Sequence, residues 1–156
     1  MRIEQITEFA LSDQSIPESA LDMSATLLID TVGVAAGAAG LEVAHIARDH
    51  ACAFHASSEP QNAASLMFDG RRASIPGAAF AAATQIDNLD AHDGYNPTKG
   101  HIGCAVVPAL FAFAENQPEL SAREALSVLI MSYEIAARAG IALHASACDY
   151  HTSGAW

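Results

Sequence analysis

Apolar residues recur at helical spacing along most of the chain, and short polar breaks divide the pattern into successive helices. A first helix is indicated by three apolar residues at intervals of three, Ile3, Ile6 and Phe9. A second, the longest apolar segment, starts after Pro17 and is expected to end at Gly40, because glycine often terminates helices. A third helix is expected over 41–54.

The pattern changes between residues 55 and 74. The segment SSEPQN is typical of a loop, ASLMF of a short strand and DGRR of a tight turn, which together predict one short β hairpin near 64–74. Ser74, followed by Pro76, predicts the start of a fourth helix. Its expected buried stripe consists of Ile75, Ala79, Ala82, Ile86 and Leu89.

Two further helices follow a polar segment. One is expected over roughly 104–115, with Pro108 tolerated because it lies near the first turn. The last begins with a capping box formed by Ser121 and Glu124. Its shared face comprises Leu126, Ile130, Tyr133, Ala137, Gly140, Ile141 and His144. We therefore expect a mainly α fold, a single helical domain over 1–156, with at most the one hairpin.

The amino-acid composition supports a mainly helical fold and argues against one class of binding partner. Alanine accounts for 34 of the 156 residues, and alanine favours closely packed helices over sheets. The net charge of −11 argues against a nucleic-acid partner, because such binding depends on cations that meet phosphates. The three cysteines, Cys52, Cys104 and Cys148, are an odd number without a C-x-x-C pair, which favours a reducing, cytoplasmic compartment.

One stretch, 26–46, has about the length needed to span a bilayer. Asp30, Glu42 and His45 interrupt it, and its glycines and alanines suit a packed soluble core equally well. The first residues carry acids and lack a continuous apolar run, so no signal peptide is expected. The sequence therefore predicts no association with a membrane.

The polar segment 87–101 is the most informative part of the chain. A carboxylate stands at every third position, Asp87, Asp90 and Asp93, and the segment ends in Lys99 and His101. On a helical wheel, Asp90 lies about 60° from the centre of the apolar stripe, which predicts partial burial, whereas Asp87 lies toward solvent. Partial burial and nearby cations shift a carboxyl pKa in opposite directions, as a general acid or base requires.

Lys99 is the only lysine in the chain, and it stands beside His101 just ahead of a predicted helix. The free N–H groups and the positive dipole end of that helix would point at the same place. This arrangement predicts a local site for a carboxylate ligand in an otherwise acidic protein.

Less specific interpretations apply to the same residues. Aspartates near a turn often form only a solvated helix end. A metal site built from Asp90, His92, Asp93 and His101 is chemically possible, but no recognised ligand spacing is present, so no metal is predicted. No chemical role is expected for the remaining histidines before the C-terminal segment, His45, His50, His55 and His144. His151 belongs equally well to a site or to a turn.

Four segments carry a resemblance to a known family: LLIDTVGVAAGAAG, AAATQIDNLDAHDG, KGHIGCAVVPALFAFAE and YHTSGAW. In order and spacing they resemble the MmgE/PrpD family, which includes 2-methylcitrate dehydratase, cis-aconitate decarboxylase and iminodisuccinate epimerase. The resemblance implies the N-terminal portion of a larger all-helical domain, without the inserted lid domain. We expect either more of the same chain or a second subunit, in a homodimer, to cover the apolar face of the last helix.

The resemblance also implies an activity: a lyase or isomerase that works without a cofactor or metal on a small di- or tricarboxylate. The residues implied as proton-transfer groups are Asp90, His101 and His151. Lys99, Asp93 and Tyr95 would bind the substrate. Gly94 departs from the family pattern by lacking a hydroxyl, and the segments AHDG and KGH are more similar to the epimerase branch.

A second hypothesis belongs to another class. The chain would then be a truncated, inactive helical module that uses its apolar faces to bind a partner or itself. The residues leave open which polycarboxylate and which of the three reactions apply under the first hypothesis.

Overall fold

The structure is a computed structural model that describes residues 3–146. Those residues form six α-helices, two short 3₁₀ helices and one antiparallel pair of strands, so the fold is mainly α, as predicted. The elements are, in chain order, α1 (Ile3–Leu11), α2 (Glu18–Ala38), α3 (Glu42–Phe54), η1 (Pro60–Asn62), β1 (Ala63–Ser65), β2 (Arg72–Ser74), α4 (Ile75–Leu89), η2 (Asn96–Thr98), α5 (Gly103–Ala114) and α6 (Ala122–Ser146).

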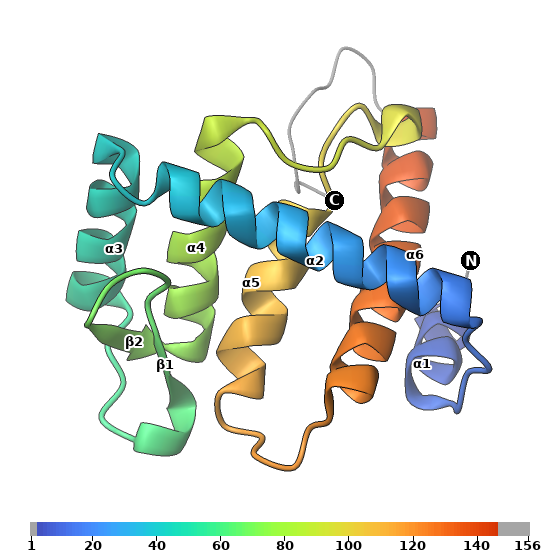
Figure 1. The fold of residues 1–156 in the computed structure, drawn as a ribbon, viewed down its shortest axis with the longest axis horizontal. Coiled ribbons are helices and arrows are strands. Elements are labelled where there is room, and N and C mark those ends of the chain that lie inside the picture. Colours follow the sequence, from blue (N-terminus) through green and yellow to red (C-terminus); the bar gives the residue numbers. More distant parts are fainter. Residues whose placement is uncertain (1–2, 147–156) are drawn as a thin grey trace.

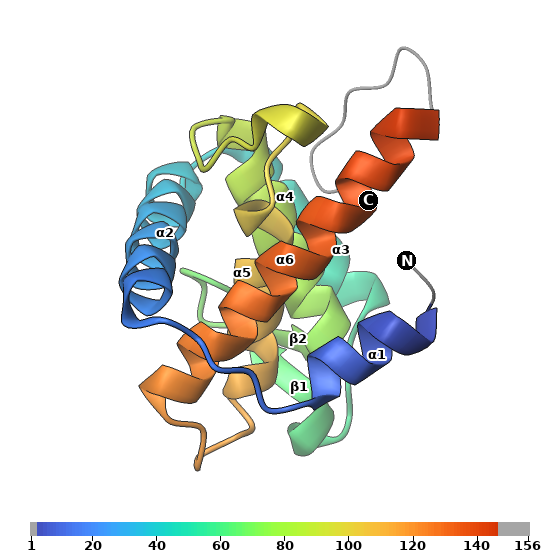
Figure 2. The ribbon, with the colours of Figure 1, turned by 90° about the vertical axis from the view of Figure 1, so that its right-hand side faces the viewer.

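Four helices stand side by side and a fifth crosses them. Figure 1 shows α3, α4, α5 and α6 in a row, with α2 lying across the face of α4, α5 and α6. In the view of Figure 2, turned by 90°, α2 lies to one side of this row. The short hairpin β1–β2 packs against α3, α4 and α5. The helix α4 thus has α3 on one side and α5 on the other.

Small side chains dominate the contacts between these helices. The buried alanines of the helices are Ala35, Ala38, Ala44, Ala47, Ala51, Ala78, Ala81, Ala82 and Ala112. Alanine lets two backbones approach closely, but each one buries little apolar surface. Only a few large apolar side chains, among them Leu66, Ile86 and Leu129, are buried almost completely. Shape and polar contacts therefore carry much of the specificity of this core.

Short sequence motifs correctly predicted the start of α4, the start of α6 and the hairpin. The Ser74 hydroxyl accepts the Gly77 N–H at the start of α4, 3.2 Å away. The capping box is also present, because Ser121 N donates to Glu124 and Glu124 N donates to the Ser121 hydroxyl. The predicted hairpin forms with Ala64 opposite Ala73 in the register. These contacts are local in sequence, which is why a pattern reveals them.

Two predictions about helix faces and ends were wrong. Gly40 is not the cap of α2; the cap is Ala39 in a right-handed conformation, and Leu41 N closes the turn onto Ala38 O. The predicted stripe of α4 is also displaced, since Gln85 is buried whereas Leu89 is 38% exposed. In both places, packing against neighbouring helices decides the outcome and sequence periodicity does not.

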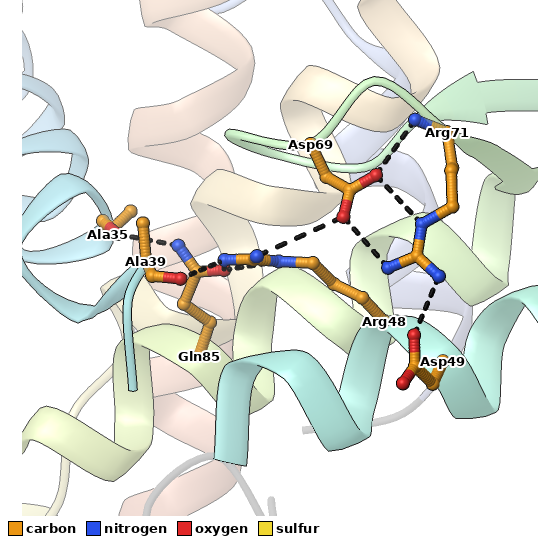
Figure 3. A network of polar contacts seen from close by, with 7 residues as sticks. All are labelled: Ala35, Ala39, Arg48, Asp49, Asp69, Arg71 and Gln85. Atoms are coloured by element: carbon orange, nitrogen blue, oxygen red, sulfur yellow. Dashed lines mark hydrogen bonds and ion pairs between the residues drawn. The ribbon is translucent and has the colours of Figure 1, made fainter. Parts of the chain in front are cut away.

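A buried arginine connects the helices that carry the small residues. The Arg48 side chain of α3 donates to Ala39 O at the end of α2 and to Gln85 Oε1 of α4, both at 2.7 Å. Gln85 in turn donates to Ala35 O of α2. The Asp69 carboxylate of the hairpin turn lies 3.9 Å from Arg48 (Figure 3). One side chain thus connects four segments that lie far apart in the sequence.

The Asp69 carboxylate is held from a second direction. Figure 3 shows Arg71 between Asp69 and Asp49, with hydrogen bonds to both carboxylates. The Arg71 hydrogen bond, opposed by burial and assisted by the charge of Arg48, lowers the pKa of Asp69 to about 2. Asp69 is therefore ionised at neutral pH, and the charge of the buried Arg48 has a counterion.

Two helices, α2 and α6, are long and apolar enough to cross a membrane by length and composition alone. This is weak evidence, because core helices of soluble proteins pass the same test. In this fold α2 buries Ser24 and Thr31, and the Ser24 hydroxyl donates to Leu126 O of α6 at 3.3 Å. The two helices thus pack on each other as part of the bundle.

Removal of the guanidinium in Arg48→Met leaves Gln85, Asp69 and Ala39 O without their shared donor. We expect the free energy of unfolding to fall by about 2–4 kcal/mol, because buried polar partners lose their hydrogen bonds while the apolar stem is conserved. Arg138→Met is the matched control. In the described part of the chain Arg138 forms an ion pair with Glu134 on the exposed surface of α6, and the loss of this pair should cost less than about 0.5 kcal/mol. Urea denaturation of both variants measures the difference, and equal losses would contradict the role of Arg48.

Candidate active site in the loop between α4 and α5

The loop between α4 and α5 is bounded by two residues in the left-handed conformation. Asp90 (φ 50°) ends α4, and Lys99 (φ 49°) ends η2. Aspartate adopts this conformation more readily than most residues, whereas for lysine it is uncommon. Between them Tyr95 N donates to Gly100 O at 2.8 Å, and η2 contacts α6. The loop is therefore a folded unit at the end of the bundle, as Figure 1 shows.

His101 is held at both ring nitrogens. Its Nδ1 lies 2.6 Å from Asp93 O and 3.1 Å from His92 O. Carbonyl oxygens only accept hydrogen bonds, so Nδ1 carries the hydrogen. The other nitrogen, Nε2, lies 3.1 Å from Asp90 Oδ1. The backbone thereby fixes the tautomer, and Nε2 is the atom that can accept or release a proton.

Asp90 is more exposed than the helical wheel predicts. Its side chain is 77% exposed, whereas that of Asp87 is only 43% exposed, which reverses the expected order. The wheel assumes that the helix continues through Asp90. Because α4 ends at Leu89 and Asp90 turns into the left-handed region, its carboxylate points to His101 instead of the core.

An open hollow of about 470 Å³ lies over the loop. His101, Lys99 and Tyr95 line it together with Gly94, Asn96 and Gly100. Lys99 is exposed, and it contributes the positive charge of this surface. The hollow thus combines an oriented imidazole and an ammonium group. The Asp90 carboxylate does not line the hollow but contacts that imidazole. Together these groups can bind a carboxylate and move a proton.

Asp93 faces the opposite way, into the protein. Both of its carboxylate oxygens accept the Gly103 N–H at the start of α5, at 3.1 and 3.2 Å. Burial raises its pKa, while the Tyr133 hydroxyl and the Gly103 N–H oppose that shift. The predicted anion position at this helix N-terminus is therefore already filled by a side chain of the protein. Of the three predicted substrate-binding residues, Asp93 does not line the hollow.

The residues around Asp93 include two that the sequence did not indicate. A side chain at Gly103 would meet Asp93 Oδ1, the Tyr133 hydroxyl and the Thr31 hydroxyl within 2.8 Å. Both hydroxyls are buried and neither makes a well-formed hydrogen bond. Burial and the charge of Asp93 raise the pKa of Tyr133 well above its ordinary value. Tyr133 was expected only as an apolar contact of the last helix, and no local signal marks Thr31.

His92 is buried beneath His101. The two rings lie 4.1 Å apart between centroids. Burial, and next the charge of His101, lower the pKa of His92, so the ring stays neutral near pH 7. The rejected metal set also included His101 and Asp93, but the His101 Nδ1 is used by carbonyl oxygens and the Asp93 carboxylate by Gly103.

The remaining histidines lie outside the loop between α4 and α5. His50 and His55 lie with Phe54 and Phe80 in a cluster of rings on the outside of α3 and α4. His144 is half-buried in the last turns of α6. His151, the third predicted proton-transfer group, lies outside the described residues. Its place relative to His101 therefore stays a prediction.

Gly103→Ala tests the close packing around Asp93. The added methyl group would lie 2.4 Å from Asp93 Oδ1, so Asp93 or α5 must move. We expect a loss of roughly 1–3 kcal/mol in the free energy of unfolding, as for other overpacked sites. Gly33→Ala in α2 is the control: nothing lies within 4 Å of the added carbon, and alanine should stabilise the helix by roughly 0.5–1 kcal/mol. Chemical denaturation should show that Gly103→Ala lowers the free energy of unfolding and that Gly33→Ala raises it. Changes in the same direction would refute the packing argument.

Asp93→Asn tests the buried carboxyl. A carboxyl whose pKa is raised on folding binds its proton more tightly in the folded protein, so its ionisation costs stability as the pH rises above 3.8. Asparagine does not ionise and still offers an oxygen to Gly103 N. The variant is expected to gain stability relative to the wild type between about pH 4 and pH 7. Urea denaturation across this range measures the difference in free energy of unfolding between the variant and the wild type. A stability advantage of the variant that grows as the pH falls would contradict the prediction.

The chain was also compared with known proteins. The family model of the MmgE/PrpD N-terminal domain matches residues 4–156, which include the loop with His101 and all helices from α2 to α6. No match was found among curated proteins or among solved structures. The chain therefore belongs to the MmgE/PrpD family and contains its N-terminal domain.

Proposed function

We propose that this chain supplies the proton-transfer wall of a lyase or isomerase that acts, without a cofactor, on a small di- or tricarboxylate. The observation that carries the proposal is the geometry of His101. Two backbone carbonyls hold the hydrogen on its Nδ1, and Asp90 lies 3.1 Å from its Nε2. His101 also lines the hollow together with the only lysine of the chain. Membership of the MmgE/PrpD family supports the same class of reaction.

The chemistry begins at a carbon next to a carboxylate. His101 Nε2 accepts the proton of that carbon, and the electron pair of the C–H bond passes toward the carboxylate. Asp90 Oδ1 lies 3.1 Å from the same nitrogen, so it accepts a hydrogen bond from the N–H that forms and stabilises the imidazolium. Lys99 binds a carboxylate of the substrate and stabilises the developing negative charge.

The fate of that charge distinguishes the three reactions of the family. In a dehydratase the neighbouring C–O bond breaks and water leaves; in an epimerase the proton returns on the opposite face. In a decarboxylase no C–H bond breaks first: the bond to the carboxylate breaks, carbon dioxide leaves, and the electron pair left on the substrate takes up a proton that His101 donates. The dehydratase and epimerase routes need an acid on the far side of the substrate, and we propose His151 for that role. The segments AHDG and KGH favour an epimerase acting on iminodisuccinate.

The other predicted residues have different parts in this scheme. Tyr95 lines the hollow and would contact the substrate. Asp93 holds the first N–H of α5, so we propose that it positions the loop instead of binding the substrate. The hollow is open, and the opposite wall would come from further residues of the protein or from a second copy in a homodimer. The free thiols of Cys52 and Cys104 are consistent with a reducing cytoplasm.

A second candidate function rests on the exposed apolar side chains. Ile29, Phe54 and Phe113 are 73%, 75% and 59% exposed, and they lie on α2, α3 and α5. Such surfaces favour association with a partner or with a second copy. An interaction module of this kind would need none of the order seen around His101. That order favours the enzyme.

The proposed function is tested with the protein as its gene encodes it, assayed with iminodisuccinate, 2-methylcitrate and cis-aconitate. His101→Asn and Asp90→Asn are expected to lower kcat on the accepted substrate, the former by roughly 10²–10⁴-fold, because a proton-transfer group is lost. His50→Asn, which changes a histidine in the outer ring cluster, is the matched control and should leave the rate unchanged. Rates like the wild type in both site variants would refute the assignment. No turnover of any of the three substrates by the wild type would favour the interaction module.

A further inference from the structure

Three potential metal ligands converge behind His101. Asp87 comes from the last turn of α4, His92 from the loop and Cys104 from the first turn of α5. One ligand atom from each, a carboxylate oxygen, a ring nitrogen and Sγ, all lie within 4.8 Å of one another. We propose that these side chains bind one zinc ion. This group is distinct from the hollow that carries the proposed proton transfer.

The state of His92 is the independent observation that points to a ligand. Its side chain is fully buried, and neither ring nitrogen has a hydrogen-bond partner among residues 3–146. The nearest carboxylate oxygen, Asp87 Oδ1, is 4.0 Å from Nε2, which is too long for a hydrogen bond. Buried polar groups in folded proteins are almost always paired, so an imidazole in this state requires a partner. A metal ion at a ring nitrogen would be one.

The chemical types of the three ligand atoms indicate which metal would bind. A thiolate and an imidazole suit zinc, whereas magnesium and calcium prefer sites made entirely of oxygen. In a tetrahedral zinc site the ligand atoms lie about 3.3–3.6 Å apart, so the present group must close by only about 1 Å. The partly exposed Asp87 side chain can provide much of that movement and also gives the ion a path from solvent.

Binding changes the bonds of Cys104. Its thiol now lies 3.4 Å from His101 O, as a donor. On binding, the S–H bond breaks, the proton passes to solvent and an S–Zn bond forms, with imidazole and carboxylate as further ligands. Water fills the fourth position. No electron is transferred, and no other reactant is needed.

The ion would connect the end of α4 to the start of α5 across the loop that holds His101. The His92 ring packs against His101, with 4.1 Å between the ring centroids, so fixing His92 also fixes one face of that histidine. The role is structural and does not depend on the proposed reaction. A protein that binds zinc here but turns over none of the three polycarboxylates would refute the proposed function and leave this inference intact.

The experiment measures zinc and cobalt binding by the full chain. One equivalent of zinc should remain per chain after dialysis, and Co²⁺ should give the charge-transfer absorption of a thiolate–cobalt bond. Cys104→Ser and His92→Gln are expected to weaken binding at least about tenfold. Cys52→Ser is the matched control, because Cys52 packs against another part of the core on α3 and should not affect the absorption.

A variant that retains only one thiol makes the test independent of whether Cys104→Ser folds. Cys52→Ser combined with Cys148→Ser leaves Cys104 as the sole cysteine. Thiolate–cobalt absorption in this protein would support the site. Its absence, or failure of the wild type to bind zinc, would overturn the proposal, and His92 would then bind a buried water. Equal binding by Cys104→Ser and Cys52→Ser would also overturn it.

Discussion

The buried guanidinium of Arg48 is the contact on which this helical arrangement depends most. A core built from alanine allows helices to approach closely, but it provides few interlocking side chains that fix their positions. Arg48 supplies that definition by binding the end of α2, Gln85 of α4 and the hairpin turn at the same time. A buried charge adds little net stability when it is paired, yet its loss leaves several partners unsatisfied. Its contribution here is to specify one arrangement of α2, α3 and α4.

The position of α4 matters because the candidate site begins where that helix ends. Asp90 leaves α4 in a left-handed conformation and meets His101, while Asp93 turns inward onto the first N–H of α5. Two aspartates three residues apart thus have different surroundings: Asp90 is exposed beside an imidazole, and Asp93 is half-buried against a helix end. The loop orients His101 with backbone carbonyls, which keep a hydrogen on Nδ1.

The site is polar on one side and open on the other. The hollow with Lys99 and His101 is suited to a carboxylate, and the buried layer beneath it contains His92, Cys104 and Asp93. Membership of the MmgE/PrpD family supports the proposed class of reaction, and the geometry of His101 supports the proposed proton transfer at its Nε2. The zinc ion proposed at His92 would have a role separate from that reaction.

The sequence by itself determined the helices, the hairpin and the loop that carries Lys99 and His101. The signals involved are short-range: a capping box at Ser121, a serine before a proline at Ser74 and a run of polar residues between apolar segments. Hydrogen bonds over three or four residues create these signals, so a pattern can reveal them. The family resemblance was also visible in the order of its motifs and is confirmed.

Only the tertiary structure decided how the polar residues divide between solvent, substrate hollow and core. The order of burial of Asp87 and Asp90 was predicted wrongly. A helical wheel assumes that the helix continues, whereas α4 ends at Leu89 and Asp90 adopts a left-handed conformation. Thr31 and Tyr133 lie beside Gly103 in the fold, although they are about seventy and thirty residues away from it in the sequence. No local sequence pattern reveals such contacts. Burial depends on long-range packing. For that reason the sequence predicted the candidate residues, and the fold assigned each described residue its environment.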